Sequence, residues 1–408
     1  MTTTAPPPIV DILNPAVYED GDPESNGLPL SSYTRLRDEA PCYLHQSQDP
    51  ACRDRVWVVT RHEDIVRVDR DAENFVNAHG VSFQKFGATT GSMIYLDGAD
   101  HRRHRNVLRA AFTPRAVSIY AQSFRVLARE IVTMAMRKDS FDFVKEISVE
   151  MPLNVMCDLL EIPQADRRQF LAWINAFAVT TDPRFAATPE AAMDGVLRTR
   201  RYTLDLARTR RAAPGPDLLS KLISAVDTGS LAEDELQAFA ILLAGAGTDT
   251  TRNALSHGIH ALIRNPQQLA WLRDRADDIP RGPIEEIIRW ASPVIHFGRT
   301  VVADTQVAGQ QVCAGEFVVM VFPAGNFDPA AFDEPTTFDL SRDPNPHVSF
   351  GVGPHSCLGR HVALLEIKIL LEELLYATSR IEQTGPIKYT RDSRLRGVHN
   401  LPVTVTRA

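Results

Sequence analysis

The sequence of 408 residues contains no run of about 18 uncharged apolar residues, which a membrane-spanning helix would require. Its first residues include neither a basic segment nor an apolar stretch, so no signal peptide is expected. Cysteine is scarce, with five scattered residues, and this odd number favours reduced thiols over a disulfide framework. Together these absences predict a cytoplasmic protein with no membrane span.

An excess of positive charge is also absent. The formal net charge is −7, which argues against a nucleic-acid partner held by bulk electrostatics. No internal repeat, long low-complexity linker or abrupt change of composition divides the chain, and apolar residues make up 44% of it, enough for a sizeable core. We therefore expect a single domain over residues 1–408, with residues 1–30 as an irregular N-terminal arm.

Helical patterns dominate the chain from about residue 101 to residue 376. Residues 56–60 and 318–321 have the β-branched, apolar composition of short strands. Residues 323–354 have the Pro, Asn, Asp and Gly content of a loop. The expected fold class is mainly α with a small β-rich region.

One predicted helix is unusually long. Ser230 with Glu233 forms a capping-box pattern, and no proline follows until Asn265-Pro266, which gives a helix of roughly 50 Å. Its centre, residues 244–251, holds two glycines and adjacent threonines, which lower helix propensity. Small residues there fit close helix–helix packing, or a helix that is thinned and locally opened so that polar groups face a cavity. The stretch alone favours neither explanation.

The segment from Phe350 to Gly359 delivers Cys357 to the first turn of a helix predicted over residues 358–375. The positive end of the helix dipole and unpaired backbone N–H groups stabilise a thiolate at such a position. Glycines let the backbone bend around the sulfur and approach a flat ligand closely. A zinc site of His355 and Cys357 is disfavoured, because no second pair of ligands lies at a zinc-like spacing. The other cysteines are interpreted as small buried apolar residues: Cys42, Cys52, Cys157 and Cys313.

This segment matches every fixed position of the haem-binding loop Phe-x-x-Gly-x-x-x-Cys-x-Gly, so the chain resembles the cytochrome P-450 superfamily. Three further segments resemble motifs of that family in the right order. Residues 246–251 resemble its oxygen-activating helix, residues 286–289 its Glu-x-x-Arg motif, and residues 101–105 its propionate-binding His-x-x-x-Arg helix. The resemblance implies the cytochrome P-450 fold, with haem b between the long helix and the helix that starts at Cys357.

The resemblance also implies a role for each matching residue. Cys357 would be the iron ligand, because a thiolate pushes electron density onto haem iron and favours O–O cleavage. Asp249 and Thr250 would be the acid–alcohol pair that relays protons to the oxygen side. The other expected haem-binding residues are His101, Arg105, Arg299 and His355, which match propionate positions, together with Ala246, Gly247, Phe350, Gly351 and Gly359.

Several of these residues also have a simpler explanation. Thr250 could donate a hydrogen bond back to the preceding helical turn, and Asp249 could be a surface residue. Arg105 could belong to a solvated basic face. Arg299 lies among apolar residues, where an unpaired charge would be costly, so a partner is expected for it.

The chain departs from the family pattern at two positions. The buried pair expected of Glu286 and Arg289 often has a charged third member in this family, but Thr337 occupies that position here. Whether Arg342 compensates is left open. Phe327 replaces a common arginine, and neither departure touches the chemistry.

The implied reaction is monooxygenation, in which one atom of O2 enters an apolar substrate and the other leaves as water. The chain has no Gly-x-Gly-x-x-Gly loop and no room for a flavin or iron–sulfur domain, so a separate ferredoxin, served by a ferredoxin reductase, is expected to supply electrons. Two other classes stay open: a haem-thiolate peroxygenase, which would not need Asp249 and Thr250, and a non-enzymatic haem-thiolate sensor or carrier. The basic residues expected to dock the acidic ferredoxin are Arg102, Arg103, Arg109, Arg360 and Lys368.

The substrate is expected to be an apolar small molecule of the terpenoid, steroid, branched-lipid or alkyl-chain type, by analogy within the family. The predicted pocket walls are residues 81–96, 170–185, 241–250 and 294–297. The candidate lining side chains are Phe83, Phe86, Met93, Ile94, Trp173, Phe177, Phe185, Ile295 and Phe297.

Overall fold

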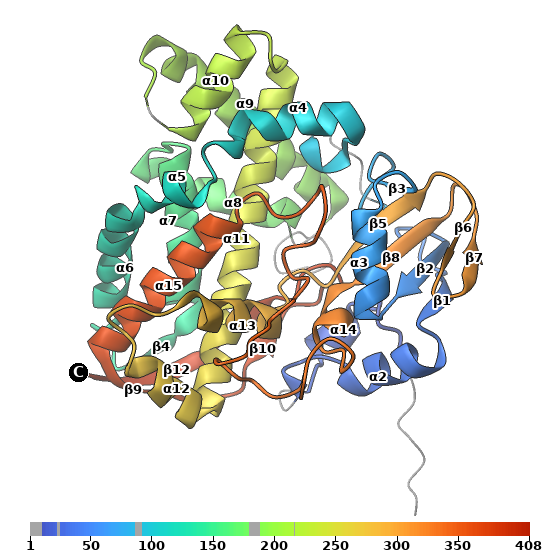
Figure 1. Ribbon diagram of the computed structural model, residues 1–408. Coiled ribbons are helices and arrows are strands. Elements are labelled where there is room, and N and C mark those ends of the chain that lie inside the picture. Colours follow the sequence, from blue (N-terminus) through green and yellow to red (C-terminus); the bar gives the residue numbers. More distant parts are fainter. Residues whose placement is uncertain (1–9, 23–24, 86–91, 179–187, 216) are drawn as a thin grey trace, which may run out of the picture.

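The computed structural model describes residues 10–22, 25–85, 92–178, 188–215 and 217–408. Helices form its larger part, and a five-stranded sheet lies to one side of them (Figure 1). One long helix, α11 (Glu233–Arg264), runs through the helical part and is drawn in yellow. The expected fold class, mainly α with a small β-rich region, is confirmed.

The helical elements are α1 (Ala16–Glu19), α2 (Leu30–Glu39), α3 (His62–Arg70), η2 (Met93–Tyr95), α4 (Gly98–Arg109), α5 (Pro114–Ser118), α6 (Ala121–Ala135), η3 (Val144–Ser148), α7 (Glu150–Leu159), η4 (Gln164–Asp166), α8 (Arg167–Ala178), α9 (Pro189–Ala212), α10 (Leu218–Asp227), α11 (Glu233–Arg264), α12 (Pro266–Arg273), α13 (Arg281–Ala291), α14 (Phe322–Asn326) and α15 (Arg360–Ala377). The strands are β1 (Cys42–Gln46), β2 (Arg55–Val59), β3 (Phe75–Val76), β4 (Ser140–Asp142), β5 (His296–Val301), β6 (Thr305–Val307), β7 (Gln310–Val312), β8 (Phe317–Val321), β9 (Thr378–Gln383), β10 (Lys388–Tyr389), β11 (Val398–Asn400) and β12 (Pro402–Arg407).

The larger sheet has the strand order β1-β2-β8-β5-β3. Both strands that the sequence predicts belong to it: β2 corresponds to residues 56–60 and β8 to residues 318–321. They pair in parallel, with Trp57 opposite Val318, and every residue of β8 is buried. A strand buried on both faces explains why residues 318–321 are uninterrupted apolar residues rather than an alternating pattern.

The long helix is confirmed, but the prediction of its start is wrong. The helix begins at Glu233, and Glu235, not Glu233, accepts the N–H of the capping residue Ala232 at 2.8 Å. Ser230 lies outside the helix, where its carbonyl accepts a hydrogen bond from Arg103. The 32 residues of α11 make it about 48 Å long.

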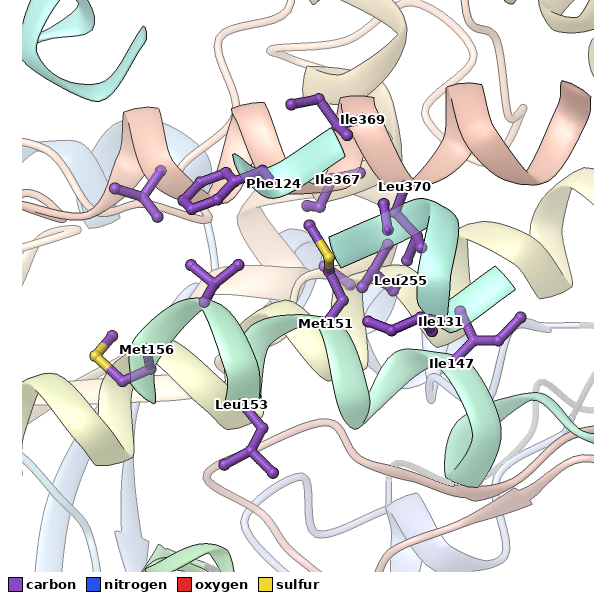
Figure 2. Packing of buried hydrophobic residues seen from close by; sticks show 14 of the residues in the cluster. Phe124, Ile131, Ile147, Met151, Leu153, Met156, Leu255, Ile367, Ile369 and Leu370 are labelled. Carbon is purple, nitrogen blue, oxygen red and sulfur yellow. The ribbon is translucent and has the colours of Figure 1, made fainter. Parts of the chain in front are cut away.

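The glycine-rich centre of α11 serves close packing without opening the helix, which stays α-helical through residues 244–251. A Cβ atom on Gly247 would lie 2.2 Å from the terminal methyl of Met156, so the side chain of Met156 from α7 packs directly on the glycine of α11. Figure 2 shows Met151 of α7 beside Leu255 of α11, within the core that α6 and α15 complete. Of the two explanations that the sequence left open, the structure shows close packing and no local opening of the helix.

The described part of the N-terminal arm is mostly turns, with one short helix, α1. Ile12, Leu13 and Tyr18 are buried against the sheet side of the molecule. The hydroxyl of Tyr18 donates to the Ile12 carbonyl at 2.8 Å. Among the described residues, no helix combines the length and the apolar composition needed to cross a membrane.

His296, the first residue of β5, is fully buried and uncharged. Its Nε2 accepts the N–H of Phe83 at 3.2 Å, which leaves Nδ1 to donate to the carbonyl of Ser393 at 2.7 Å. Burial lowers the pKa of His296 to about 4, although the Ser393 carbonyl favours the charged form. The imidazole is thus a neutral bridge between the sheet and the C-terminal segment.

The unfolding free energy should fall as the pH drops from 6.5 to about 4, because in this window the unfolded chain binds a proton at His296 and the folded chain does not. Across the whole window, His296 should lower the unfolding free energy by about 3 kcal/mol. Urea unfolding at several pH values should show a flatter pH dependence for His296→Gln than for the unaltered protein. His79→Gln, at an exposed histidine, is the control and should leave the dependence unchanged. Equal slopes for all three proteins would contradict the assignment.

Candidate functional site

A cavity between α11 and α15 gathers residues from segments that are far apart in the sequence. Apart from Asp249, every residue that the sequence assigns to the site lines this cavity. These residues are His101, Arg105, Ala246, Gly247, Thr250, Arg299, Phe350, Gly351, His355, Cys357 and Gly359.

The loop that carries Cys357 is fixed by its own backbone. The N–H of Cys357 donates to the Phe350 carbonyl at 2.7 Å. Gly351 and Gly353 have φ angles of +66° and +84°, and a Cβ on Gly353 would lie 2.7 Å from the carbonyl oxygen of Asp69. Glycine is required there by conformation and by space. Because α15 begins only at Arg360, Cys357 precedes the helix and does not lie in its first turn as predicted.

Cys357 is exposed and lies at the wall of the cavity. Burial among protein groups raises the pKa of Cys357, while the backbone N–H of Gly359 and the guanidinium groups of Arg105 and Arg360 partly offset the rise. The sulfur is therefore held where donors and cations favour a thiolate once a metal binds it. Of the other cysteines, Cys42, Cys52 and Cys157 are buried as predicted, whereas Cys313 is exposed, so that prediction is wrong.

One end of the cavity collects the groups predicted to bind carboxylates. The rings of His101 and His355 lie 4.0 Å apart, and His355 Nε2 is 3.5 Å from Asp97 Oδ1. Burial, followed by the charges of His355 and Arg105, lowers the pKa of His101 to about 4. His101 is thus a neutral hydrogen-bonding group near neutral pH.

The two arginines at this end differ in how they are paired. Arg299 is buried and donates to Asp69 Oδ1 at 2.5 Å, which confirms that it has a partner. Arg105 is partly buried and donates to the Ser356 hydroxyl at 3.4 Å. Among the described residues, no carboxylate lies within ion-pair distance of Arg105. The solvated basic face proposed as an alternative for Arg105 is therefore not what the structure shows, and its guanidinium can serve an anionic group in the cavity.

These residues fit a haem. A thiol stands at one wall, with Gly359 and Gly351 beside it, and the small residues Ala246 and Gly247 form part of the facing helix. Arg105, with no protein carboxylate of its own in the described parts of the chain, lies at the end where propionates would need a cation. The donor set of one sulfur, two imidazoles and two guanidiniums suits a thiolate-ligated iron porphyrin with two carboxylates.

Thr250 of α11 faces the cavity, whereas its neighbour Asp249 does not line it. Thr250 lines the cavity, and its hydroxyl donates to the Ala246 carbonyl at 2.7 Å, so the back-bonding alternative describes its present hydrogen bond. The hydroxyl oxygen can still accept a hydrogen bond from the cavity. Asp249 is only 1% exposed, is not a surface residue, and forms an ion pair with Arg252 at 3.0 Å.

A residue that the sequence analysis missed, Glu366 of α15, also lines the cavity. It is 2% exposed, and Thr251, the neighbour of Thr250, lines the cavity together with it. Burial raises the pKa of Glu366 well above that of an ordinary glutamate. Its signal in the sequence is an acidic residue within the otherwise apolar side of α15, between the buried Val362 and Ile369.

The rest of the cavity wall is apolar, but only part of it was predicted. Met93, Ile94 and Phe297 line the cavity as expected, and Phe86 and Phe185 lie outside the described residues. The remaining four do not line this cavity. Phe83 and Ile295 are buried in the core on the sheet side, and Trp173 and Phe177 are half-buried and pack against the helical core. Apolar lining residues that were not singled out include Val81, Leu242, Leu243 and Val294.

Beneath the cysteine loop, Glu286 and Arg289 form a pair with no exposed side-chain surface, at 2.7 and 2.8 Å. Arg342 supplies the third member, with its Nε 3.2 Å from Glu286 Oε2, so it compensates for Thr337. Thr337 contributes its backbone carbonyl, which accepts from both arginines. Phe327 packs against this pair, with the Arg289 guanidinium 5.1 Å from its ring centre.

The residues expected to dock a partner are only partly available. Arg103 is engaged by the carboxylate of Glu235 at 2.7 and 2.9 Å, and Lys368 is paired with Asp278. Arg360 is bound to Glu285 at 2.8 Å while its side chain stays 40% exposed. Exposed residues that keep the expected position include Arg102 and Arg109.

Comparison with known proteins gives a consistent result. The sequence model of the family described as Cytochrome P450 matches residues 170–279 and 281–386. The chain is 32% identical over 401 residues to a steroid C26-monooxygenase of Rhodococcus jostii, an alignment that covers 95% of this chain and 84% of the relative. It is 34% identical to a methyl-branched lipid omega-hydroxylase of Mycobacterium tuberculosis, covering 85% of this chain and 83% of the relative.

The fold also matches solved structures. A cytochrome P450 of Mycobacterium marinum, solved in complex with pseudoionone, superimposes with a TM-score of 0.89 at 35% sequence identity. The match covers 99% of this chain and 100% of that one. Fold, sequence motifs and curated relatives thus agree over nearly the whole length of the chain.

Replacing Glu286 by Ala should destabilise the protein by about 3–5 kcal/mol, because it leaves Arg289 buried without its carboxylate. Urea unfolding measures the loss. Glu39→Ala removes an exposed i,i+4 pair with Arg35 and should change the midpoint little. If the two variants unfold at the same urea concentration, the buried network does not stabilise the fold as described.

Proposed function

The chain belongs to the cytochrome P450 family, and we propose that it uses haem b to hydroxylate the end of a branched alkyl chain on a lipid or steroid. The observation that carries this proposal is one cavity with two kinds of lining. Cys357, Thr250 and the propionate-binding candidates share it with an apolar wall that includes Leu243, Val294 and Phe297. Monooxygenation is the activity of the family. The residue roles, the substrate class and the electron donor are part of the proposal.

Cys357 would ligate the iron, and haem, when bound, supplies the centre at which O2 is activated for insertion into a C–H bond. Arg105 and His101 would bind one propionate, and Arg299 and His355 the other. Since Arg299 and His355 already face Asp69 and Asp97, those carboxylates share their donors with the cofactor and keep the buried charges balanced.

Thr250 would hold a proton at the oxygen side. Its hydroxyl donates to the Ala246 carbonyl, which fixes the direction of its hydrogen atom and leaves its lone pairs toward the cavity. A water molecule could donate to those lone pairs and pass a proton inward. Asp249, ion-paired with Arg252 behind the helix, would be a relay that reaches the cavity only by turning its side chain.

The substrate would be held by shape and apolar contact. The part of the wall away from the cysteine loop and the propionate-binding candidates is mostly apolar, and its side chains include Met93, Leu242, Leu243, Val294 and Phe297. The two curated relatives are named for oxidation at position 26 of a steroid and at the omega end of a methyl-branched lipid. Both names refer to the terminus of an alkyl chain, and this shared chemistry is what we transfer.

The electrons would come from an acidic ferredoxin. A second hollow, on the other side of the cysteine loop, is lined by Arg105, Arg109, Arg360 and His361 together with Cys357. No acidic side chain of the described residues lines it. Such a basic recess next to the sulfur favours the approach of a negatively charged electron donor.

Cys357→Ala should abolish the red-shifted Soret band that the reduced, carbon monoxide-bound protein shows when a thiolate ligates the iron. The reason is that no other cysteine of the described residues lines the cavity. Cys313→Ala, at an exposed cysteine, is the matched control and should keep the band. An intact band in Cys357→Ala would contradict the assignment of Cys357 as the iron ligand.

Hydroxylated product is expected from a methyl-branched fatty acid or a steroid with a branched side chain, supplied with ferredoxin, its reductase, NADPH and O2. Oxidation should fall on a terminal methyl, as identified by mass spectrometry. A hydrophilic sugar of similar mass is the negative control for binding, which is followed by the Soret shift. If neither lipid shifts the Soret band nor yields product, while the carbon monoxide band is normal, the substrate class is wrong and the haem assignment stands.

A further inference from the structure

One wall of the cavity is assembled from short segments that are far apart in the sequence. The segments of this three-segment wall are residues 81–84, 293–298 and 393–396. The side chains with which it lines the cavity include Val81, Val294 and Phe297. The N–H of Gly298 donates to the Val81 carbonyl at 2.8 Å, and the N–H of Ile295 donates to the Arg394 carbonyl at 2.8 Å. The shape of this wall therefore depends on what keeps the segments together.

Four buried polar side chains connect the segments in a closed hydrogen-bond network: Ser82, Gln84, His296 and Ser393. The Ser82 hydroxyl donates to Gln84 Oε1 at 2.7 Å, and Gln84 Nε2 donates to the Ser393 hydroxyl at 2.9 Å. His296 closes the network, because it binds both the Ser393 carbonyl and the N–H of Phe83. Each segment of the wall is thus bonded to the other two, and every polar side-chain atom of the four residues has a partner.

Strand β5 relates this network to the position of the cofactor. Successive side chains of a strand point to opposite faces. Phe297 and Arg299 share one face of β5, where the first belongs to the wall and the second is a propionate-binding candidate. His296 lies on the opposite face, within the network. Because β5 carries all three residues, the network fixes the wall relative to the cofactor site.

The network acts on a substrate only through the wall. Of the described residues that line the cavity, none belongs to the network. A buried polar network in which every group is satisfied makes its surroundings rigid, whereas removal of one partner leaves the others unsatisfied. Gln84 is the most exposed to such a loss, since its amide is both a donor and an acceptor here.

We propose that Gln84, His296 and Ser393 are positioning residues that determine which carbon of the alkyl chain is oxidised. The inference rests on the proposed hydroxylation of a branched alkyl chain, and it places part of the selectivity behind the wall, in side chains that do not touch the substrate. With the network intact, the wall is rigid and only the end of the chain reaches the site of oxidation. With the network broken, the segments separate and neighbouring carbons reach that site as well.

The first test is hydrogen exchange of the haem-loaded protein, followed by mass spectrometry. Gln84→Met keeps an unbranched side chain of similar length and removes both hydrogen bonds of the amide. Peptides that contain Phe83 and Gly298 should exchange about tenfold faster in this variant, because their N–H groups bond across the segments. Unchanged exchange of both peptides would overturn the proposal.

Thr378→Val is the control for both tests. It removes a buried hydroxyl that donates to the Leu374 carbonyl at 2.7 Å, at the start of β9. Of the described residues that line the cavity, none belongs to β9. This variant should leave the exchange of the Phe83 and Gly298 peptides as it is in the unaltered protein, and faster exchange there would contradict the assignment of these peptides to the network.

The second test is the distribution of products from a methyl-branched fatty acid. The ratio of terminal to internal hydroxylation should fall about tenfold in Gln84→Met, since a misplacement of about 1 Å is enough to change a rate by up to 100-fold. The carbon monoxide band should stay, because Cys357 is not altered. Thr378→Val should keep both the ratio and the band. A Gln84→Met enzyme that unfolds at lower urea concentration but keeps the product ratio would show a purely structural role and refute the proposal.

A smaller change keeps the proposal testable if Gln84→Met does not fold. Ser393→Ala removes one fully buried hydroxyl, as Thr378→Val does, but this hydroxyl belongs to the network. Exchange of the same peptides and the product ratio should change in the same direction as in Gln84→Met. A folded Ser393→Ala enzyme with the exchange and the ratio of the unaltered protein would contradict the proposal.

Failure of this inference is distinguishable from failure of the proposed function. If the unaltered enzyme forms no terminal product from either lipid, the proposed function fails. If it forms that product and the network variants form it in the same ratio, only the positioning role fails.

Discussion

The position of the reactive sulfur depends on a carboxylate that has no contact with water, Glu286. Its two oxygens accept hydrogen bonds from Arg289, Arg342, Asn345 and the backbone of Asp339. Arg289 in turn donates to the carbonyl of Asn326, whose side chain binds the backbone N–H of Val348 and the hydroxyl of Ser349. Those residues begin the loop that ends at Cys357. Since a buried charge is tolerated only with all its partners in place, the loop has one allowed arrangement.

The parts of this arrangement that the sequence predicts are those whose residues are close to one another along the chain. Glycines with positive φ, a cysteine before a helix and an i,i+3 pair are local patterns, and Gly353, Cys357 and Glu286 follow them. Pairs between distant segments gave no such pattern. Asp69 with Arg299 spans 230 residues, and Asp97 with His355 joins two loops. Periodicity shows that Phe83 and Ile295 are buried, but it does not distinguish a core from a cavity wall.

Charge pairing explains why the predicted docking surface is smaller than the sequence suggested. A basic residue on a helix that begins near an acidic helix N-terminus finds a carboxylate, as Arg103 does with Glu235. The three hydrogen bonds that Glu235 accepts from Arg103 and Ala232, with the contribution of His104, lower the pKa of Glu235 to about 2. That carboxylate is ionised at any physiological pH, so Arg103 stays engaged. Three cations remain beside the cysteine loop, Arg105, Arg109 and Arg360, and two of them, Arg105 and Arg360, also act on the sulfur.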